Sequence, residues 1–188
     1  MSSIAIVFHS GYGHTAAVAQ AVASGVAEVA GTTAHLIPIE EFEAKSALVD
    51  QADAVIFGSP TYMGAVSGPF KTFMDSTSGR WMQRSWANKL AAGFTVSASQ
   101  SGDKLATLQQ LAVFGAQHGM LWVGLDLLPG NNNSKGSVDD LNRLGSFLGA
   151  MAQANADQGA EVTPPESDRK TAAYLGKRVA EAALRWTK

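Results

Sequence analysis

The chain has 188 residues, of which 46% are hydrophobic and 16% are charged. This length suits one sizeable α/β core and is short for two, so we expect a single domain that spans residues 1–188. The net charge of −2 supplies no field for a phosphate backbone, which argues against a nucleic-acid partner. Cysteine is absent, which excludes disulfides, thiolate catalysis and iron–sulfur clusters. Any redox chemistry therefore requires a bound cofactor.

The start of the chain lacks the features of a targeting segment. Met1-Ser2-Ser3 carries no basic side chain and leads directly into the apolar run from Ile4 to Phe8. No apolar run approaches the ~20 residues that a membrane-spanning helix needs. We therefore expect a cytoplasmic protein that has no membrane partner.

Short apolar segments and helical patterns alternate along the chain, which predicts an α/β fold with a doubly wound parallel sheet. The expected strands cover residues 4–9, 32–37, 54–58, 90–97 and 120–125. The expected helices cover residues 15–29, 46–51 and 103–118, with two more beginning at Pro69 and near Ser167. Gly25 lets the first helix lie close against the sheet. Within the stretch 126–157, residues 130–137 are expected to form a loop, and residues 138–155 a helix or in part a strand.

The turn after the first strand, Ser10 to Thr15, has the composition of a phosphate-binding loop. Its two glycines let backbone N–H groups converge on an anion at the start of a helix, and Ser10 and Thr15 add hydroxyl donors. A tight strand-to-helix turn with a Ser or Thr cap is the plainer reading. Gly11 to Ala16 also fits the dinucleotide pattern G-x-G-x-x-A, but no acidic residue lies at the end of the second strand where a ribose would be held.

Two further loops follow strands that should end at the same edge of the sheet. Gly58 to Gly64 offers amides, a hydroxyl and an aromatic ring, so a flat ring could rest there; a rigid crossover loop is the alternative. Ser97 to Gly102 is a small polar loop that could donate amides to a ring carbonyl or cap the next helix. Trp81 could shield a planar ring, pack a subunit contact or fill the core.

The four histidines have no metal-ligand spacing, so no metal site is expected. His118 ends a predicted helix, where it could donate to an anionic ring or a hydride acceptor. The alternative is that it simply complements the helix dipole.

Five ordered motifs resemble those of the flavodoxin-like FMN proteins, and among these the WrbA type of NAD(P)H:quinone oxidoreductase. They are Ser-x-Tyr-Gly-His-Thr at residues 10–15, Gly-Ser-Pro-Thr at 58–61, Ser-Gly-Pro-Phe-Lys-Thr-Phe-Met-Asp at 67–75, Gly-Arg-Trp at 79–81 and Gln-His-Gly-Met at 117–120. The resemblance covers nearly the whole chain and implies the strand order 2-1-3-4-5.

The resemblance also implies a set of site residues. Ser10, Tyr12, Gly13, His14 and Thr15 would hold the FMN phosphate. The flavin ring would lie between two loops, made of Pro60, Thr61, Tyr62, Met63 and Gly64 and of Ser97, Ala98, Ser99, Gln100, Ser101 and Gly102. His118 and Trp81 match family positions beside the ring and are the candidate catalytic residues. The family builds its flavin pocket partly from neighbouring chains, which predicts a homo-dimer or homo-tetramer.

The expected function is two-electron reduction of a quinone by NADH or NADPH, through hydride transfer to flavin N5 in a ping-pong sequence. Two alternatives use the same fold: a flavodoxin-type one-electron carrier, and a flavin reductase or azoreductase. Carriers of this type are usually strongly acidic, so the near-neutral charge counts against the first. No sequence feature separates the second from quinone reduction.

Overall fold

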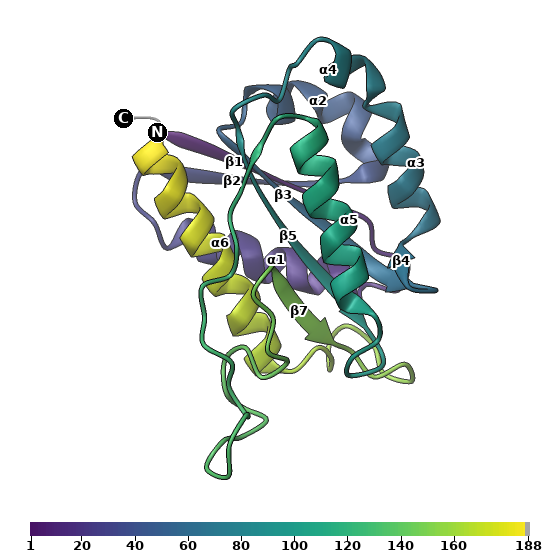
Figure 1. The fold of residues 1–188 in the computed structure, drawn as a ribbon, viewed down its shortest axis with the longest axis vertical. Coiled ribbons are helices and arrows are strands. Elements are labelled where there is room, and N and C mark those ends of the chain that lie inside the picture. The colour runs from purple at the N-terminus through teal and green to yellow at the C-terminus, as the bar shows by residue number, and fades with distance from the viewer. Residues whose placement is uncertain (187–188) are drawn as a thin grey trace.

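The computed structural model describes residues 1–186 and has a parallel β-sheet with helices on both faces (Figure 1). The strands are β1 (Ser2–Phe8), β2 (Thr32–Pro38), β3 (Ala54–Tyr62), β4 (Ala65–Val66), β5 (Leu90–Ser97), β6 (Leu121–Trp122) and β7 (Ala150–Gln153). The helices are α1 (His14–Ala27), η1 (Ile39–Glu41), α2 (Phe42–Gln51), α3 (Gly68–Ser76), α4 (Ser78–Met82), α5 (Lys104–Gln117) and α6 (Glu166–Trp186).

The order of the main strands is β2-β1-β3-β5-β6, which confirms the predicted order 2-1-3-4-5. Strand β1 pairs in parallel with β2 and β3, with Ile4 aligned with Ala34 on one side and Ala54 on the other. Because helices cover both faces, the middle strands are buried on both sides and consist mainly of apolar residues.

Two apolar clusters lie on opposite faces of the sheet. Helices α1 and α6 cover one cluster, and α2, α3 and α5 cover the other. The close approach that Gly25 permits is to α6 and not to the sheet. A Cβ atom at Gly25 would lie 1.8 Å from the carbonyl oxygen of Ala173, and one at Gly176 would lie 2.0 Å from that of Val22. The two helices therefore pack almost backbone to backbone.

The fifth strand position differs from the prediction of one strand over residues 120–125. Only Leu121–Trp122 pairs with the start of β5, and Ala150–Gln153 pairs with its other end. The chain leaves the sheet between them, turning at Asp126, which has a φ of 53°, and forms the loop at the bottom of Figure 1. Two hydrogen bonds fix the backbone where it leaves the sheet: Val123 N donates to Ala91 O at 2.7 Å, and Leu125 N donates to Phe147 O at 2.9 Å.

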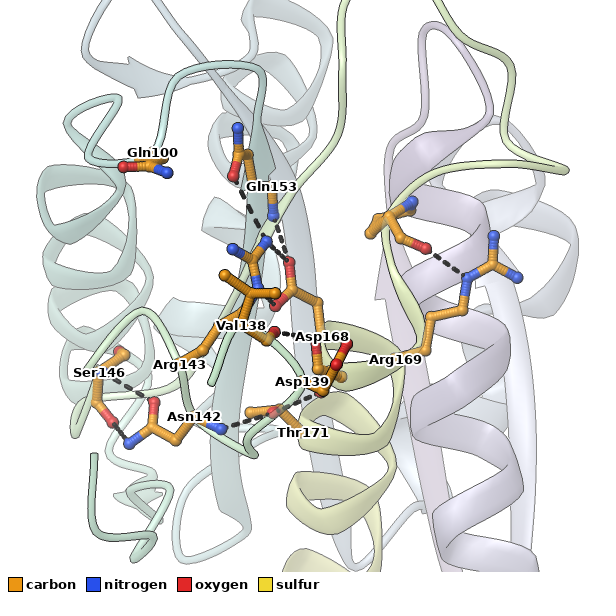
Figure 2. A network of polar contacts seen from close by, with 12 residues as sticks. Gln100, Val138, Asp139, Asn142, Arg143, Ser146, Gln153, Asp168, Arg169 and Thr171 are labelled. Carbon is orange, nitrogen blue, oxygen red and sulfur yellow. Dashed lines mark hydrogen bonds and ion pairs between the residues drawn. The ribbon is translucent and has the colours of Figure 1, made fainter. Parts of the chain in front are cut away.

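The inserted segment, residues 123–149, is attached to α6 by buried polar contacts (Figure 2). The Arg143 guanidinium donates to both carboxylate oxygens of Asp168 at 2.8 Å, and the two side chains are 8% and 2% exposed. Asn142 N donates to Thr171 Oγ1 at 2.8 Å. These contacts fix the inserted segment against α6, and the chain after it returns to the sheet as β7, which pairs with β5.

Among the helices within residues 1–186, none is both long enough and apolar enough to cross a membrane.

Candidate functional site

A cleft of about 670 Å³ lies at the carboxyl ends of the strands. This is the edge at which doubly wound proteins bind their ligands. Three of the predicted loops reach it, together with a fourth segment that the sequence did not indicate. The lining residues are Tyr12, His14, Thr15, Pro60, Tyr62, Val96, Ser97, Ala98, Ala154, Ala156, Asp157, Gln158 and Gly159.

The first loop presents the N-terminus of α1 to this cleft. Gly13 is the N-cap residue and lies in the left-handed region at a φ of 86°, so the N-cap position itself offers no side-chain acceptor, and the first turn of the helix holds no acidic residue. The first amides of a helix have no acceptor within the helix, and the helix dipole makes this end positive. Ser10 Oγ accepts a hydrogen bond from Ala16 N at 3.1 Å, and Thr15 is 2% exposed. This end of α1 is therefore suited to an anion.

The second loop is a hairpin between β3 and β4. Tyr62 pairs with Ala65, so Met63 and Gly64 form a two-residue turn, and both have the positive φ that such a turn needs, 50° and 78°. Successive side chains of a strand point to opposite faces. Pro60 and Tyr62 accordingly line the cleft, while Thr61 points away from it.

Three residues at the base and tip of this hairpin do not line the cleft. Thr61 Oγ1 lies 2.8 Å from the hydroxyl oxygens of Thr95 and Thr107, in a buried cluster. Met63 is fully exposed, and a Cβ atom at Gly64 would have no neighbour within 4 Å. Of the five residues predicted for this loop, the structure brings Pro60 and Tyr62 into the cleft.

Two tyrosines stand at the side of the cleft. The rings of Tyr12 and Tyr62 meet edge to face with centroids 6.4 Å apart. Partial burial, and to a lesser degree the neighbouring Tyr12, raises the pKa of Tyr62 above its usual value. The Tyr62 phenol is therefore neutral at physiological pH, and it presents apolar ring surface with a polar tip.

The third loop, residues 97–102, enters the cleft only at Ser97 and Ala98. Its other predicted residues, Ser99 to Gly102, lie beyond the lining. The ammonium of Lys104 fixes two of their carbonyl groups, because it donates to Ser99 O at 2.6 Å and Gln100 O at 2.8 Å. Gln153 Nε2 donates to Ala98 O at 3.2 Å, so β7 also fixes this loop.

The fourth wall of the cleft is the segment 154–159, which directly follows β7 and was missed from the sequence. His14 Nε2 lies 2.8 Å from Gln158 O, and a Cβ atom at Gly13 would be 3.2 Å from Ala160 Cβ, so this segment packs against the start of α1. Arg169 Nη2 donates to Ala160 O at 2.7 Å and anchors it to α6. If residues 150–153 had been identified as a strand from the sequence, a binding loop would have been predicted directly after it.

His118 and Trp81 lie at the other end of the sheet, which corrects the expectation that His118 is near the edge where ligands bind. Helix α5 starts after the carboxyl end of β5 and runs back, so His118 lies beside the beginning of that strand, where Asn88 N donates to Gly119 O at 2.9 Å. The eight residues of β5 span about 26 Å. Both side chains line a separate pocket of about 250 Å³.

His118 is a buried imidazole in an aromatic setting. The centroid of its ring lies 4.5 Å from the ring centroid of Trp86 and 4.8 Å from that of Phe114, and its Nε2 atom is 3.0 Å from Thr77 Oγ1. Its Nδ1 atom is buried and has no partner among residues 1–186. Burial lowers the pKa of His118, so the ring is neutral at physiological pH.

The cleft fits FMN and offers no metal centre. The N-terminus of α1, which has a glycine at the N-cap and no acidic residue in its first turn, suits a phosphate. The Pro60, Tyr62, Val96 and Ala98 side chains suit a flat apolar ring. A volume of about 670 Å³ lies within the range of cofactor pockets. No group of three or more potential metal ligands occurs in residues 1–186.

Comparisons with known proteins agree with this chemistry. The family described as "NADPH-dependent FMN reductase" matches residues 32–131. A protein named "Flavodoxin FldP" from Pseudomonas aeruginosa is 42% identical over 184 residues, which cover 96% of each chain. An "NAD(P)H dehydrogenase (quinone)" from Archaeoglobus fulgidus is 34% identical over 205 aligned positions, covering 97% of this chain and 98% of that protein.

A solved structure is similar over its whole length. It is described as a flavodoxin, WrbA-like protein from Agrobacterium tumefaciens and is 40% identical to this chain. The two structures superpose with a TM-score of 0.75, covering 98% of this chain and 99% of the other.

Proposed function

The chain belongs to the family of NADPH-dependent FMN reductases, and we propose that it is an FMN-dependent NAD(P)H:quinone oxidoreductase in which both substrates use one cleft in turn. Bound FMN supplies the reactive ring, which accepts a hydride from NAD(P)H and returns two electrons to a quinone. The protein binds and orients the cofactor and excludes competing routes.

One observation carries the proposal: the N-terminus of α1, where the N-cap residue is Gly13, opens into the same cleft as an apolar slot between two strand-end loops. The N-terminus of α1 and the Thr15 hydroxyl bind the FMN phosphate. Pro60, Tyr62 and Ala98 contact the flavin ring. Asp157 lies on the wall contributed by residues 154–159 and is a candidate for the ribityl hydroxyls, because a carboxylate accepts hydrogen bonds from them.

The single cleft favours ping-pong kinetics. Its volume of about 670 Å³ has to hold the flavin, which leaves little room for a nicotinamide and a quinone together. Oxidised nicotinamide therefore leaves before the quinone enters. Parallel double-reciprocal plots are the expected result, and intersecting plots would contradict shared occupancy.

The test starts from protein reconstituted with FMN and passed through gel filtration, which should retain flavin absorbance at one FMN per chain. NADH and NADPH consumption is then compared with benzoquinone, free FMN and an azo dye as acceptors. Benzoquinone should give the largest kcat/KM. A larger value with free FMN or the dye would identify a flavin reductase or azoreductase instead.

A one-electron carrier is the second candidate, because a relative that is 42% identical is named a flavodoxin. A carrier stabilises the one-electron radical of its flavin, whereas two-electron quinone reduction avoids it. Anaerobic titration with dithionite separates the two. A large long-wavelength radical band midway through reduction, together with no NAD(P)H oxidation by any quinone, would favour the carrier.

A role for His118 and Trp81 in the reaction requires a second chain. The two side chains line a pocket about one strand length from their own cleft, so in a homo-dimer or homo-tetramer they would reach the cleft of a neighbour. Trp81 is 52% exposed, and Met82 beside it is 76% exposed, which leaves apolar surface for such a contact. Light scattering that gives the mass of one chain with full activity would refute this assembly.

A further inference from the structure

Lys104, the first residue of α5, is a lysine with no solvent exposure. Its ammonium donates to three successive carbonyl oxygens of the loop before it: Ser99 O at 2.6 Å, Gln100 O at 2.8 Å and Ser101 O at 3.5 Å. A lysine is almost never fully buried without partners, because removing its charge from water is costly. Here the partners are carbonyl dipoles of a loop that enters the candidate FMN cleft.

The surroundings of Lys104 leave one positive charge in excess. Asp168 and Arg143 are the charged groups that act on the ammonium, the first favouring its charge and the second opposing it. These two already pair with each other through two hydrogen bonds at 2.8 Å. The carboxylate of Asp103 belongs to an exposed residue. The start of a helix also disfavours a cation, so neither the ion pair nor the helix accounts for a charge at this place.

The hydrogen bonds from Lys104 determine which way the peptide groups of this loop point. The carbonyl oxygens of residues 99–101 accept from the Lys104 ammonium, and Ala98 O accepts from Gln153 Nε2. In a trans peptide the N–H group points opposite to the C=O group. The amides of residues 100–102 therefore point away from the ammonium, and within residues 1–186 none of them donates to a protein acceptor.

We propose that Lys104 is a positioning residue of the redox site, which orients the loop amides and adds a buried positive charge that favours the two-electron-reduced flavin ring over the oxidised ring. The inference rests on the proposed FMN-dependent function. NAD(P)H transfers two electrons and one proton to the ring as a hydride and leaves as NAD(P)⁺. The reduced ring thereby gains one negative charge. A quinone then takes the two electrons and the proton, with a second proton from water, and the ring returns to its oxidised state.

The substitution Lys104→Met tests this, because methionine keeps an unbranched side chain and removes the charge and the donors. The matched control is Lys170→Met, which removes an ammonium that is 65% exposed. For the FMN-loaded proteins we measure the dissociation constant of oxidised FMN and the two-electron midpoint potential. Lys104→Met should lower the affinity for reduced FMN at least tenfold more than that for oxidised FMN. This change lowers the midpoint potential by about 30 mV. The control should leave both values unchanged.

A second measurement uses the wild-type protein alone and decides the matter if Lys104→Met does not fold or does not retain FMN. Burial lowers the pKa of Lys104 to about 8. Above that pH the oxidised protein loses the ammonium proton and regains it on reduction, so the midpoint potential should fall more steeply with pH above about 8 than below. Equal losses of affinity for both redox states in Lys104→Met, or an unbroken slope through pH 8, would overturn the inference. Failure of the wild-type protein to bind FMN would instead refute the proposed function.

Discussion

Replacing Asp168 by Asn should strongly destabilise the protein. Asp168 is 2% exposed and accepts three hydrogen bonds at 2.8 Å, two from the Arg143 guanidinium and one from Gln153 N (Figure 2). Asparagine keeps the shape but leaves the Arg143 cation buried without a counter-charge. Breaking a buried pair in this way costs about 3–5 kcal/mol. For 188 residues, whose unfolding entropy is about 0.4 kcal/mol/K, this corresponds to a fall in Tm of about 10 °C.

The assay is urea denaturation of the apoprotein, so that FMN binding does not contribute. The matched control is Asp139→Asn, which makes the same chemical change at an exposed residue of the inserted segment and should alter the free energy of unfolding by less than about 0.5 kcal/mol. The double variant Arg143→Met, Asp168→Leu removes both charges and should be more stable than Asp168→Asn. A loss below about 1 kcal/mol in Asp168→Asn, or a double variant less stable than it, would refute the reasoning.

Three further predictions concern the cleft and the two ends of the sheet. Thr15→Ala removes one hydrogen bond to a charged phosphate and should lower FMN affinity by about 1.5–3 kcal/mol, or roughly ten- to a hundredfold, in a fluorescence titration; unchanged affinity would contradict a phosphate at this site. Because the pKa of Lys104 is lowered to about 8, the unfolded chain binds more protons between about pH 8 and pH 10.5. Across this window the free energy of unfolding of the wild-type protein should rise by up to about 3 kcal/mol relative to Lys104→Met, and parallel urea-denaturation profiles would count against a buried ammonium. His118→Ala and Trp81→Ala should lower quinone turnover more than FMN affinity, and the opposite result in steady-state assays would assign them to holding the cofactor.

Local patterns in the sequence determine the class of the fold and three walls of the cleft. Buried strands such as Ile4 to Phe8 are recognisable because both their faces are apolar, and the polar or glycine-rich turn after each strand must then lie at one edge of a parallel sheet. The sequence therefore predicts that the loops after β1, β3 and β5 meet. Alternation along β3 also implies that neighbouring residues of a loop cannot all face the ligand, although which of Pro60 and Thr61 faces it depends on the register.

The tertiary structure alone decides how the fifth strand position is filled and what the fourth wall is. Residues 150–153 form a strand because the Arg143–Asp168 pair and the Asn142–Thr171 contact return the inserted segment to the sheet, and these partners are 25 and 29 residues apart. The direction of α5 likewise places His118 about one strand length from the cleft of its own chain. A sequence pattern reports which face of an element is apolar, but contacts between distant segments follow from packing that no local spacing encodes.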